Sequence, residues 1–341
     1  STSSLEDLIF MILKYISMKE VKSTKKTNFV KKILIKVCRI FGYELIDQST
    51  LDLPVSSKNY QDVISVPGKK SISIGLGETS VTRKIEALDI IVKTCTSIQL
   101  VAQNKRRIFE ENKSEYTFRT INSLVKSAKN LEKNFKEIKI KFIIIDVGSP
   151  SSDINKILSK ISNEGFKVEH IEIENTNNSK DAKANTMASI RRSFNVAKNC
   201  SDLIYFVEDD YLHEEDALIE MIYTYQKISS QLNDEIVLCP ADYPYLYVNM
   251  EFTKNMIGFK KHWRQVNQSL CTYLISNKTL NKYWSFYEDM YLNNYDPYEK
   301  PLHDLYKKID CFSPMPSLSI HLTNVNSIYG LSPVKDWIKI W

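Results

Sequence analysis

Three consecutive acidic residues, Glu208, Asp209 and Asp210, are the part of the chain best suited to chemistry. They follow an apolar run at residues 203–207, which predicts a buried strand with the acids at its C-terminal end. Carboxylates this close together repel one another unless a cation lies among them. Hard oxygen ligands select Mg²⁺ or Mn²⁺, and a diphosphate can share the same ion. We therefore expect a divalent metal site with Asp210 as its main ligand; a solvated strand end is the alternative.

Other predicted strands and helices place these acids in an α/β segment. A second apolar run, residues 141–145, ends in Asp146 and a Gly/Ser turn that starts a helix. A short strand at residues 98–102 leads to Gln103, and apolar spacing predicts a helix at residues 116–131. This alternation predicts a largely parallel sheet with right-handed crossovers. In such sheets ligands bind beyond the carboxyl ends of the strands, where Asp146 and the three acids lie.

The order of these motifs resembles that of nucleotide-sugar-dependent, family-2-like glycosyltransferases of the GT-A fold, over roughly residues 97–341. In that family a "VDDGS" strand end precedes a basic helix and an apolar strand that ends in a D-x-D-type motif. Asp146-Val147-Gly148-Ser149 stands for the first of these motifs and Glu208-Asp209-Asp210 for the second. Further motifs resemble a bacterial subgroup, at residues 240–244, 262–264, 316–321 and 332–337.

The resemblance implies a GT-A-type, Rossmann-like, mostly parallel sheet flanked by helices. It also implies a metal-dependent, inverting transfer of a hexosyl or related group from a nucleotide-diphosphate donor to a hydroxyl acceptor. Mn²⁺ or Mg²⁺ would be held by Asp210 with Glu208 and a late histidine, His321. Donor contacts are expected from Gln103, Asp146, Asn185, Arg192, Glu208, Asp209, Asp242 and Trp263.

An inverting transfer needs a base to take the proton of the acceptor hydroxyl, and the resemblance implies that this base comes from the C-terminal half of the chain. Asp296 is the first candidate and Asp289 the second, while Glu288 and Asp304 stay open as alternatives. Alternatively, His321 is a hydrogen-bonded structural residue, and each of the base candidates is an ordinary acidic residue of the surface.

Two other functions stay open beside this one. A nucleotidyltransferase would also place a metal at strand ends, although no Gly-rich, basic N-terminal loop for a triphosphate is present. A catalytically silent sugar-nucleotide-binding protein would keep the carboxylates without a working base. The expected acceptor is a glycan, a lipid-linked sugar or a small molecule, in surface polysaccharide biosynthesis or glycolipid assembly.

The composition is that of a globular protein with a substantial core. The 341 residues are 43% hydrophobic, and 46 basic against 41 acidic residues give a net charge of +5, too mild to imply nucleic acid. Six scattered cysteines contain no C-x-x-C pair, which fits a reducing cytoplasm. Among 8 glycines there is no dinucleotide-binding or P-loop motif. We expect a cytoplasmic location, peripheral at the inner face of the membrane.

Residues 1–90 form a separate helical region ahead of a catalytic domain at residues 91–341. Amphipathic helices are expected at residues 5–16 and 29–41, an irregular connector at 51–77 and another helix at 81–93. In the second helix an apolar stripe lies opposite four cations, Lys31, Lys32, Lys36 and Arg39. Residues 27–43 therefore fit an anionic membrane surface, and packing against the catalytic domain is the alternative.

Overall fold

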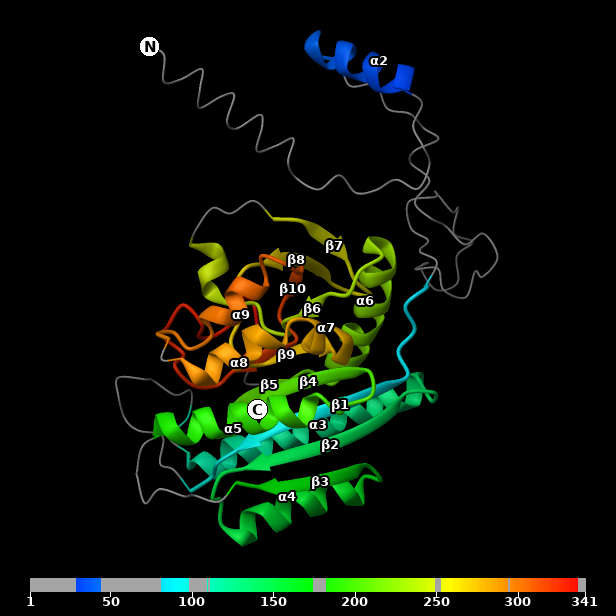
Figure 1. Ribbon diagram of the computed structural model, residues 1–341. Helices are drawn as coiled ribbons and strands as arrows, with labels where there is room; N and C mark the ends of the chain where they lie inside the picture. The colour runs from blue at the N-terminus through cyan, green and yellow to red at the C-terminus, as the bar shows by residue number, and fades with distance from the viewer. Residues whose placement is uncertain are drawn as a thin grey trace. The chain divides into compact units, whose positions relative to one another are not determined.

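The computed structural model describes residues 29–43, 81–97, 109, 111–173, 182–248, 253–293 and 295–336 (Figure 1). The chain divides into two compact units, Ser1–Ser80 and Val81–Trp341. In the first unit, helix α2 (Phe29–Ile40) confirms the expected basic helix. The turn after the helix contains Gly42, whose φ of +80° is a left-handed conformation that favours glycine. The helix expected at residues 5–16 and the connector at 51–77 lie outside the described residues.

A nine-stranded sheet in the order β3-β2-β1-β4-β9-β6-β10-β8-β7 forms the centre of the second unit. Its strands are β1 (Ala87–Thr94), β2 (Lys139–Asp146), β3 (Lys167–Glu172), β4 (Leu203–Glu208), β6 (Val237–Leu238), β7 (Asn255–Ile257), β8 (His262–Val266), β9 (Tyr273–Ser276) and β10 (Cys311–Met315). Strands β3, β2, β1 and β4 pair in parallel, whereas β9 runs antiparallel to β4 and β6. Strands β5 (Tyr211–His213) and β11 (Ser319–His321) form a separate antiparallel pair.

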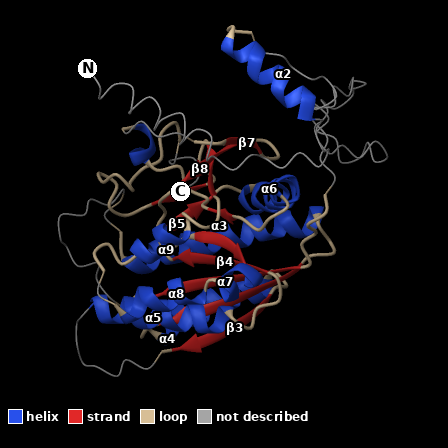
Figure 2. Cartoon of the chain, turned by 45° about the horizontal axis from the view of Figure 1, so that its top comes forward, coloured by secondary structure: helices blue, strands red, loops and turns tan. Residues whose placement is uncertain are grey.

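Helices lie around the sheet (Figure 2), and their contacts with one another divide them into two groups. The first group is α3 (Lys113–Asn134), which packs against both α4 (Ser151–Asn163) and α6 (Ala217–Leu232). The second is α5 (Ala182–Ala197), α7 (Asn277–Lys282), α8 (Trp284–Leu292) and α9 (Lys300–Leu305), with α8 in contact with the other three. The predicted fold class, α/β with a mostly parallel sheet between helices, is confirmed. None of the described helices has the length and hydropathy that a membrane span requires.

The helix expected at residues 81–93 is wrong, because residues 87–94 form the central strand β1. Strand β1 lies between β2 and β4, and seven of its eight residues are buried. A strand covered on both faces is apolar along its length and lacks the period of two, so periodicity cannot separate it from a buried helix. The domain boundary expected after residue 90 falls inside this strand. The strand expected at 98–102 lies outside the described residues.

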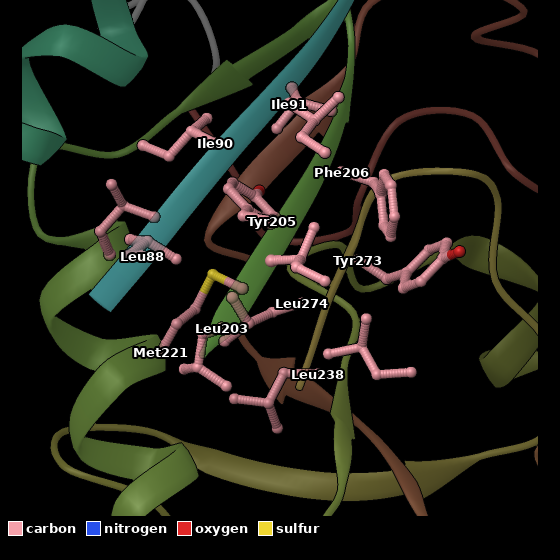
Figure 3. Close-up of a cluster of buried hydrophobic side chains, with 14 of the residues drawn as sticks. Leu88, Ile90, Ile91, Leu203, Tyr205, Phe206, Met221, Leu238, Tyr273 and Leu274 are labelled. Carbon is pink, nitrogen blue, oxygen red and sulfur yellow. The ribbon is translucent and has the colours of Figure 1, made fainter. Parts of the chain in front are cut away.

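Apolar side chains from distant segments pack around β1 and β4 (Figure 3). The cluster includes Leu88, Ile90, Ile91, Leu203, Tyr205, Phe206, Met221, Leu238, Tyr273 and Leu274, each no more than 3% exposed. Burial of such side chains contributes about 1.5–3 kcal/mol each. The two strands are therefore held firmly, and so are the polar residues at their carboxyl ends.

Candidate active site

The sheet register brings the carboxyl ends of three strands to one edge. Lys93 at the end of β1 is paired in register with Glu208 of β4, and Thr94 with Asp146 of β2. The chain then enters β5, whose first residue pairs with His321 of β11. As a result His321 Nε2 lies 3.4 Å from Asp210 Oδ2. Strand pairing thus joins the two expected metal ligands from opposite ends of the domain.

His321 is held so that its Nε2 atom faces Asp210. Its Nδ1 lies 3.0 Å from the carbonyl oxygen of Tyr329, which can only accept, so Nδ1 carries a proton. The ring stacks on Tyr211 with 4.9 Å between centroids, and Nε2 lies 3.0 Å from Thr323 Oγ1. Burial alone would lower the pKa of His321, but the negative charge of Asp210 overrides it and raises the pKa above its ordinary value.

Asp210 is an ionised carboxylate whose side chain is 13% exposed. Thr323 Oγ1 donates a 2.6 Å hydrogen bond to its Oδ2. Burial alone would raise its pKa, yet the positive charges of His321 and Lys113 hold the pKa well below the usual range. Asp210 therefore stays negative at neutral pH and is available to a cation.

The other two acids of the motif already have lysine partners. Lys93 Nζ lies 3.4 Å from Glu208. Lys113, the first residue of α3, forms an ion pair with Asp209, which also accepts hydrogen bonds from Thr117 Oγ1 (2.9 Å) and the Cys95 N–H (3.2 Å). Lysine ammonium groups thus compensate two of the three negative charges, a role that we expected a metal ion to have. Asp209 also links α3 to the end of β1 through its contacts.

A divalent ion fits Asp210 and His321 but not the full predicted set. The described part of the chain holds no group of three or more His, Cys, Asp or Glu side chains that could bind a metal. Glu208 pairs with Lys93 instead of joining Asp210 and His321, which corrects its place among the expected ligands. A histidine whose second nitrogen donates to a carbonyl is a typical metal ligand. One or two protein ligands with phosphate oxygens are sufficient for Mg²⁺.

Asp146 is buried and holds the turn after β2. Its carboxylate accepts hydrogen bonds from Thr94 Oγ1 (2.8 Å), Ser149 Oγ (2.6 Å) and the Ser149 N–H (2.9 Å). Gly148, between them, has a φ of +67°. A carboxylate has about four acceptor positions, so three internal bonds leave little capacity for the expected contact with the donor.

Trp263 and Asp242 lie in the other half of the sheet. Trp263 is 0% exposed, and its Nε1 donates a 3.1 Å hydrogen bond to Glu220 on α6. No face of the ring is open, so Trp263 packs in the core and is not available for the expected donor contact. Asp242 follows β6 and binds Arg264 and the Tyr247 hydroxyl (2.5 Å). Burial raises the pKa of Asp242 despite the charge of Arg264.

The two residues of α5 that we expect to contact the donor lie at different distances from the carboxyl edge of the sheet. This helix connects the parallel strands β3 and β4, so its first turn lies at the carboxyl edge of the sheet. Asn185 is in that first part, whereas the exposed Arg192 lies about 10 Å further along the axis, away from the edge. Gln103 lies outside the described residues.

The two expected bases, Asp296 and Asp289, are not the most buried acidic residues of their region. Asp296 is exposed, and Asp289 is half-buried and accepts from Asn293 and the Tyr295 hydroxyl (2.7 Å). By contrast Glu299 is only 5% exposed, and burial followed by the charge of Glu208 raises its pKa to about 7. The sequence signal for Glu299 is weak: it precedes a Lys-Pro pair, and proline is common in the first turn of a helix.

A surface cavity of about 700 Å³ lies apart from these acids, along α3 and the connection from β5 to α6. Its lining is mostly charged and includes Glu115, Arg119, Lys126 and Glu214. Asp210 and His321 do not line it, so it is distinct from the candidate site.

Comparison with known proteins gives distant structural similarities. No family model matches the chain, and no curated protein matches its sequence. The solved structures that resemble it include residues 1–349 of S. aureus TarS, with a TM-score of 0.39 and 12% identity over 67% of this chain and 60% of that one. Galactosyltransferase LgtC, in complex with donor and acceptor sugar analogues, has a TM-score of 0.33 and 12% identity over 66% of this chain and 72% of its own. A putative glucose-1-phosphate thymidylyltransferase from Bacillus anthracis, in complex with sucrose, has a TM-score of 0.37 and 11% identity over 69% of this chain and 89% of its own. All three TM-scores are below 0.5.

Proposed function

We propose that the protein is a metal-dependent glycosyltransferase that moves a sugar from a nucleotide-diphosphate donor to a hydroxyl acceptor. The observation that supports this best is the pairing of Asp210 with His321 at the carboxyl edge of a mostly parallel sheet. This edge is where α/β proteins bind their ligands. The order of sequence motifs supports the same function, with a glycan, lipid-linked or small-molecule acceptor.

Asp210 and His321 are the residues that would hold Mn²⁺ or Mg²⁺. When bound, such an ion supplies positive charge against the departing diphosphate. Lys93 forms an ion pair with Glu208, and Lys113 with Asp209, beside this position. In this proposal Glu208 would accept from a donor hydroxyl, and Asn185 would donate from the first part of α5.

The proposal predicts metal-dependent binding of a nucleoside diphosphate. Calorimetric titration of UDP and of GDP into the protein should show binding with Mn²⁺ and a loss of at least tenfold with a chelator. Asp210→Asn should lose the metal-dependent part, because it removes a ligand charge. Asp234→Asn changes an exposed aspartate in the connection before β6 and is the matched control. Unchanged, metal-independent affinity in Asp210→Asn would contradict the proposal.

The substrate that the protein consumes and the product that it releases distinguish the alternative functions. A glycosyltransferase releases a nucleoside diphosphate, whereas a nucleotidyltransferase uses a nucleoside triphosphate and releases pyrophosphate. Binding of the nucleotide sugar without turnover, in the presence of Mn²⁺ and a panel of acceptors, would indicate a catalytically silent binding protein.

A further inference from the structure

The side-chain hydroxyl of Thr323 lies between the two residues that we expect to bind the metal. Its Oγ1 atom is 2.6 Å from Asp210 Oδ2 and 3.0 Å from His321 Nε2. These last two atoms are 3.4 Å apart, so one neutral oxygen is within hydrogen-bond distance of both. Thr323 is 7% exposed, and little water can therefore compete for either contact.

The backbone brings Thr323 to this position. Strand β11 ends at His321, which pairs with Tyr211, the residue after Asp210. The Leu322 N–H then donates to the Asp210 carbonyl oxygen (2.9 Å). Three successive residues thus contact Asp210, through a ring, a backbone amide and a hydroxyl. A β-branched side chain has few χ1 rotamers, so a fixed backbone also fixes the threonine hydroxyl.

The direction of the shorter hydrogen bond follows from the chemistry of its two atoms. A carboxylate can only accept, and a hydroxyl has a single hydrogen to donate. The 2.6 Å contact is therefore a bond from Thr323 to Asp210, at a length typical of hydroxyl–carboxylate bonds. The χ2 angle of an aspartate rotates broadly when nothing holds it. The bond from Thr323 fixes this angle and keeps Oδ2 on the side of His321.

His321 is held by other groups. The Tyr329 carbonyl oxygen accepts from its Nδ1, and its ring stacks on Tyr211. The ring is therefore oriented without Thr323, whereas the Asp210 carboxylate is oriented by the threonine hydroxyl. Loss of that hydroxyl should release one ligand and leave the other in place.

We propose that Thr323 is a positioning residue that turns Asp210 toward His321 and so sets the affinity of the pair for Mn²⁺ or Mg²⁺. The inference rests on the proposed function. Its physical basis is preorganisation, since atoms that already face one another lose less freedom when an ion binds. Groups that hydrogen-bond to metal-ligating side chains typically contribute about 10–100-fold in metal affinity.

A role in stability alone would give different results. In that case the hydroxyl would only strengthen the packing of residues 321–323, and its loss would lower the free energy of unfolding without a change in metal affinity. The hydroxyl and the volume of the side chain can be varied separately. Thr323→Val replaces the hydroxyl with a methyl group, whereas Thr323→Ser keeps the hydroxyl and removes the methyl group.

The affinity for Mn²⁺ tests the proposal without knowledge of the sugar or the acceptor. Free Mn²⁺ is measured by electron paramagnetic resonance as the ion is titrated into the full chain, alone and with UDP or GDP, against blanks without protein. Thr323→Val should raise the Kd for Mn²⁺ by about 10–100-fold, and Thr323→Ser should stay within about threefold of the wild type. A residue that matters only for its volume would not be replaced in this way by serine.

Thr224 on α6 offers a matched control. It is 0% exposed, and its hydroxyl donates a 3.2 Å hydrogen bond to the carboxylate of Glu220, which is 1% exposed. Thr224→Val removes the same kind of bond, so it should lower the midpoint of thermal unfolding and leave the Kd for Mn²⁺ unchanged. Thermal unfolding of every variant checks that the domain is folded. If Thr323→Val does not fold, Thr323→Ala is compared with Thr323→Ser, because these two differ by the hydroxyl alone.

The outcomes distinguish this inference from the proposed function. If the wild type binds Mn²⁺ and folded Thr323→Val binds it within about threefold as tightly, the role of Thr323 is overturned and the glycosyltransferase proposal stands. Equal losses of affinity in Thr323→Val and Thr323→Ser, or in Thr323→Val and Thr224→Val, also overturn it, because they show an effect of volume or of general stability. Failure of the wild type to bind Mn²⁺, alone or with either nucleotide, overturns both.

Discussion

At the scale of single residues, the ion pair of Lys113 with Asp209 shows how an acidic motif becomes part of the framework. Asp209 is 9% exposed and has three partners, from α3 and from the residue that follows β1. Removing one member of a buried pair leaves the other charge without compensation, which costs more than the pair itself contributes. The middle acid of the motif therefore stabilises the edge, and Asp210 is left to bind ligand.

Lys113→Met should lower the free energy of unfolding by about 3 kcal/mol, because it leaves the Asp209 carboxylate buried without its cation. Lys129→Met is the control on the same helix, since Lys129 and Glu132 are 33% and 47% exposed and such pairs contribute about 0–1 kcal/mol. Urea unfolding of both variants measures the difference. Equal effects of the two substitutions would contradict a buried pair, and adding Asp209→Asn to Lys113→Met should recover part of the loss.

Glu299 should also make stability depend on pH. Its folded pKa of about 7 lies above the ordinary value of 4.5, so the folded state binds this proton more tightly than the unfolded state. Its contribution is complete below about pH 4.5 and is lost as the pH rises through 7. Glu299→Gln should remove this contribution, so the variant gains roughly 1–3 kcal/mol relative to wild type between pH 5 and pH 8. Urea unfolding at both pH values tests this, and parallel curves for the two proteins would show that Glu299 titrates normally.

At the scale of elements, the short pairing of β5 with β11 does most to complete the site. Strand β5 follows Asp210 directly, and β11 ends at His321. The backbone also joins them, because the Leu322 N–H donates to the Asp210 carbonyl oxygen (2.9 Å). A three-residue ladder thus decides which histidine of the chain reaches the acidic motif.

Helix α2 is the element for which we predict contact with an anionic membrane. Its sequence carries Lys31, Lys32, Lys36 and Arg39, and each cation near anionic lipid contributes about 1 kcal/mol. Replacing the four cations with glutamine should weaken binding by roughly tenfold or more and reduce its sensitivity to salt. Co-sedimentation with phosphatidylserine vesicles at low and high salt measures this, with neutral phosphatidylcholine vesicles as control. Equal pelleting of both proteins, or of neither, would favour packing of the helix against protein.

At the scale of the whole molecule, the second compact unit begins at Val81 rather than after residue 90. Arg83 ties the start of this unit to two other segments, through Asp202 Oδ1 (2.5 Å) and Glu235 Oε1 (3.1 Å). Strand β1 follows and lies between β2 and β4. A boundary after residue 90 would remove half of the central strand.

Two truncations test the extent of the folded unit. Residues 81–341 should fold with the same midpoint of thermal unfolding as the full chain and bind the nucleoside diphosphate equally well. Residues 91–341 should fail to fold, since they lack buried Leu88 and Ile90 and the Arg83 ion pairs, a loss of several kcal/mol from a total of about 5–15. Circular dichroism and calorimetry distinguish them. A folded, cooperative 91–341 fragment would contradict the assignment of β1 as essential.

The sequence by itself determined the α/β class, strands β2 and β4 and the acids at their ends, because a buried parallel strand followed by polar residues is a local pattern. It failed at β1, where the same continuous apolar pattern also fits a buried helix. Only the tertiary structure decided that Lys93 and Lys113 pair with two of the acids, that Trp263 is core, and that His321 meets Asp210. Ion pairing and burial depend on which distant segments come into contact. Strand register decides these contacts, and it joins residues too far apart in the sequence for a local pattern to predict.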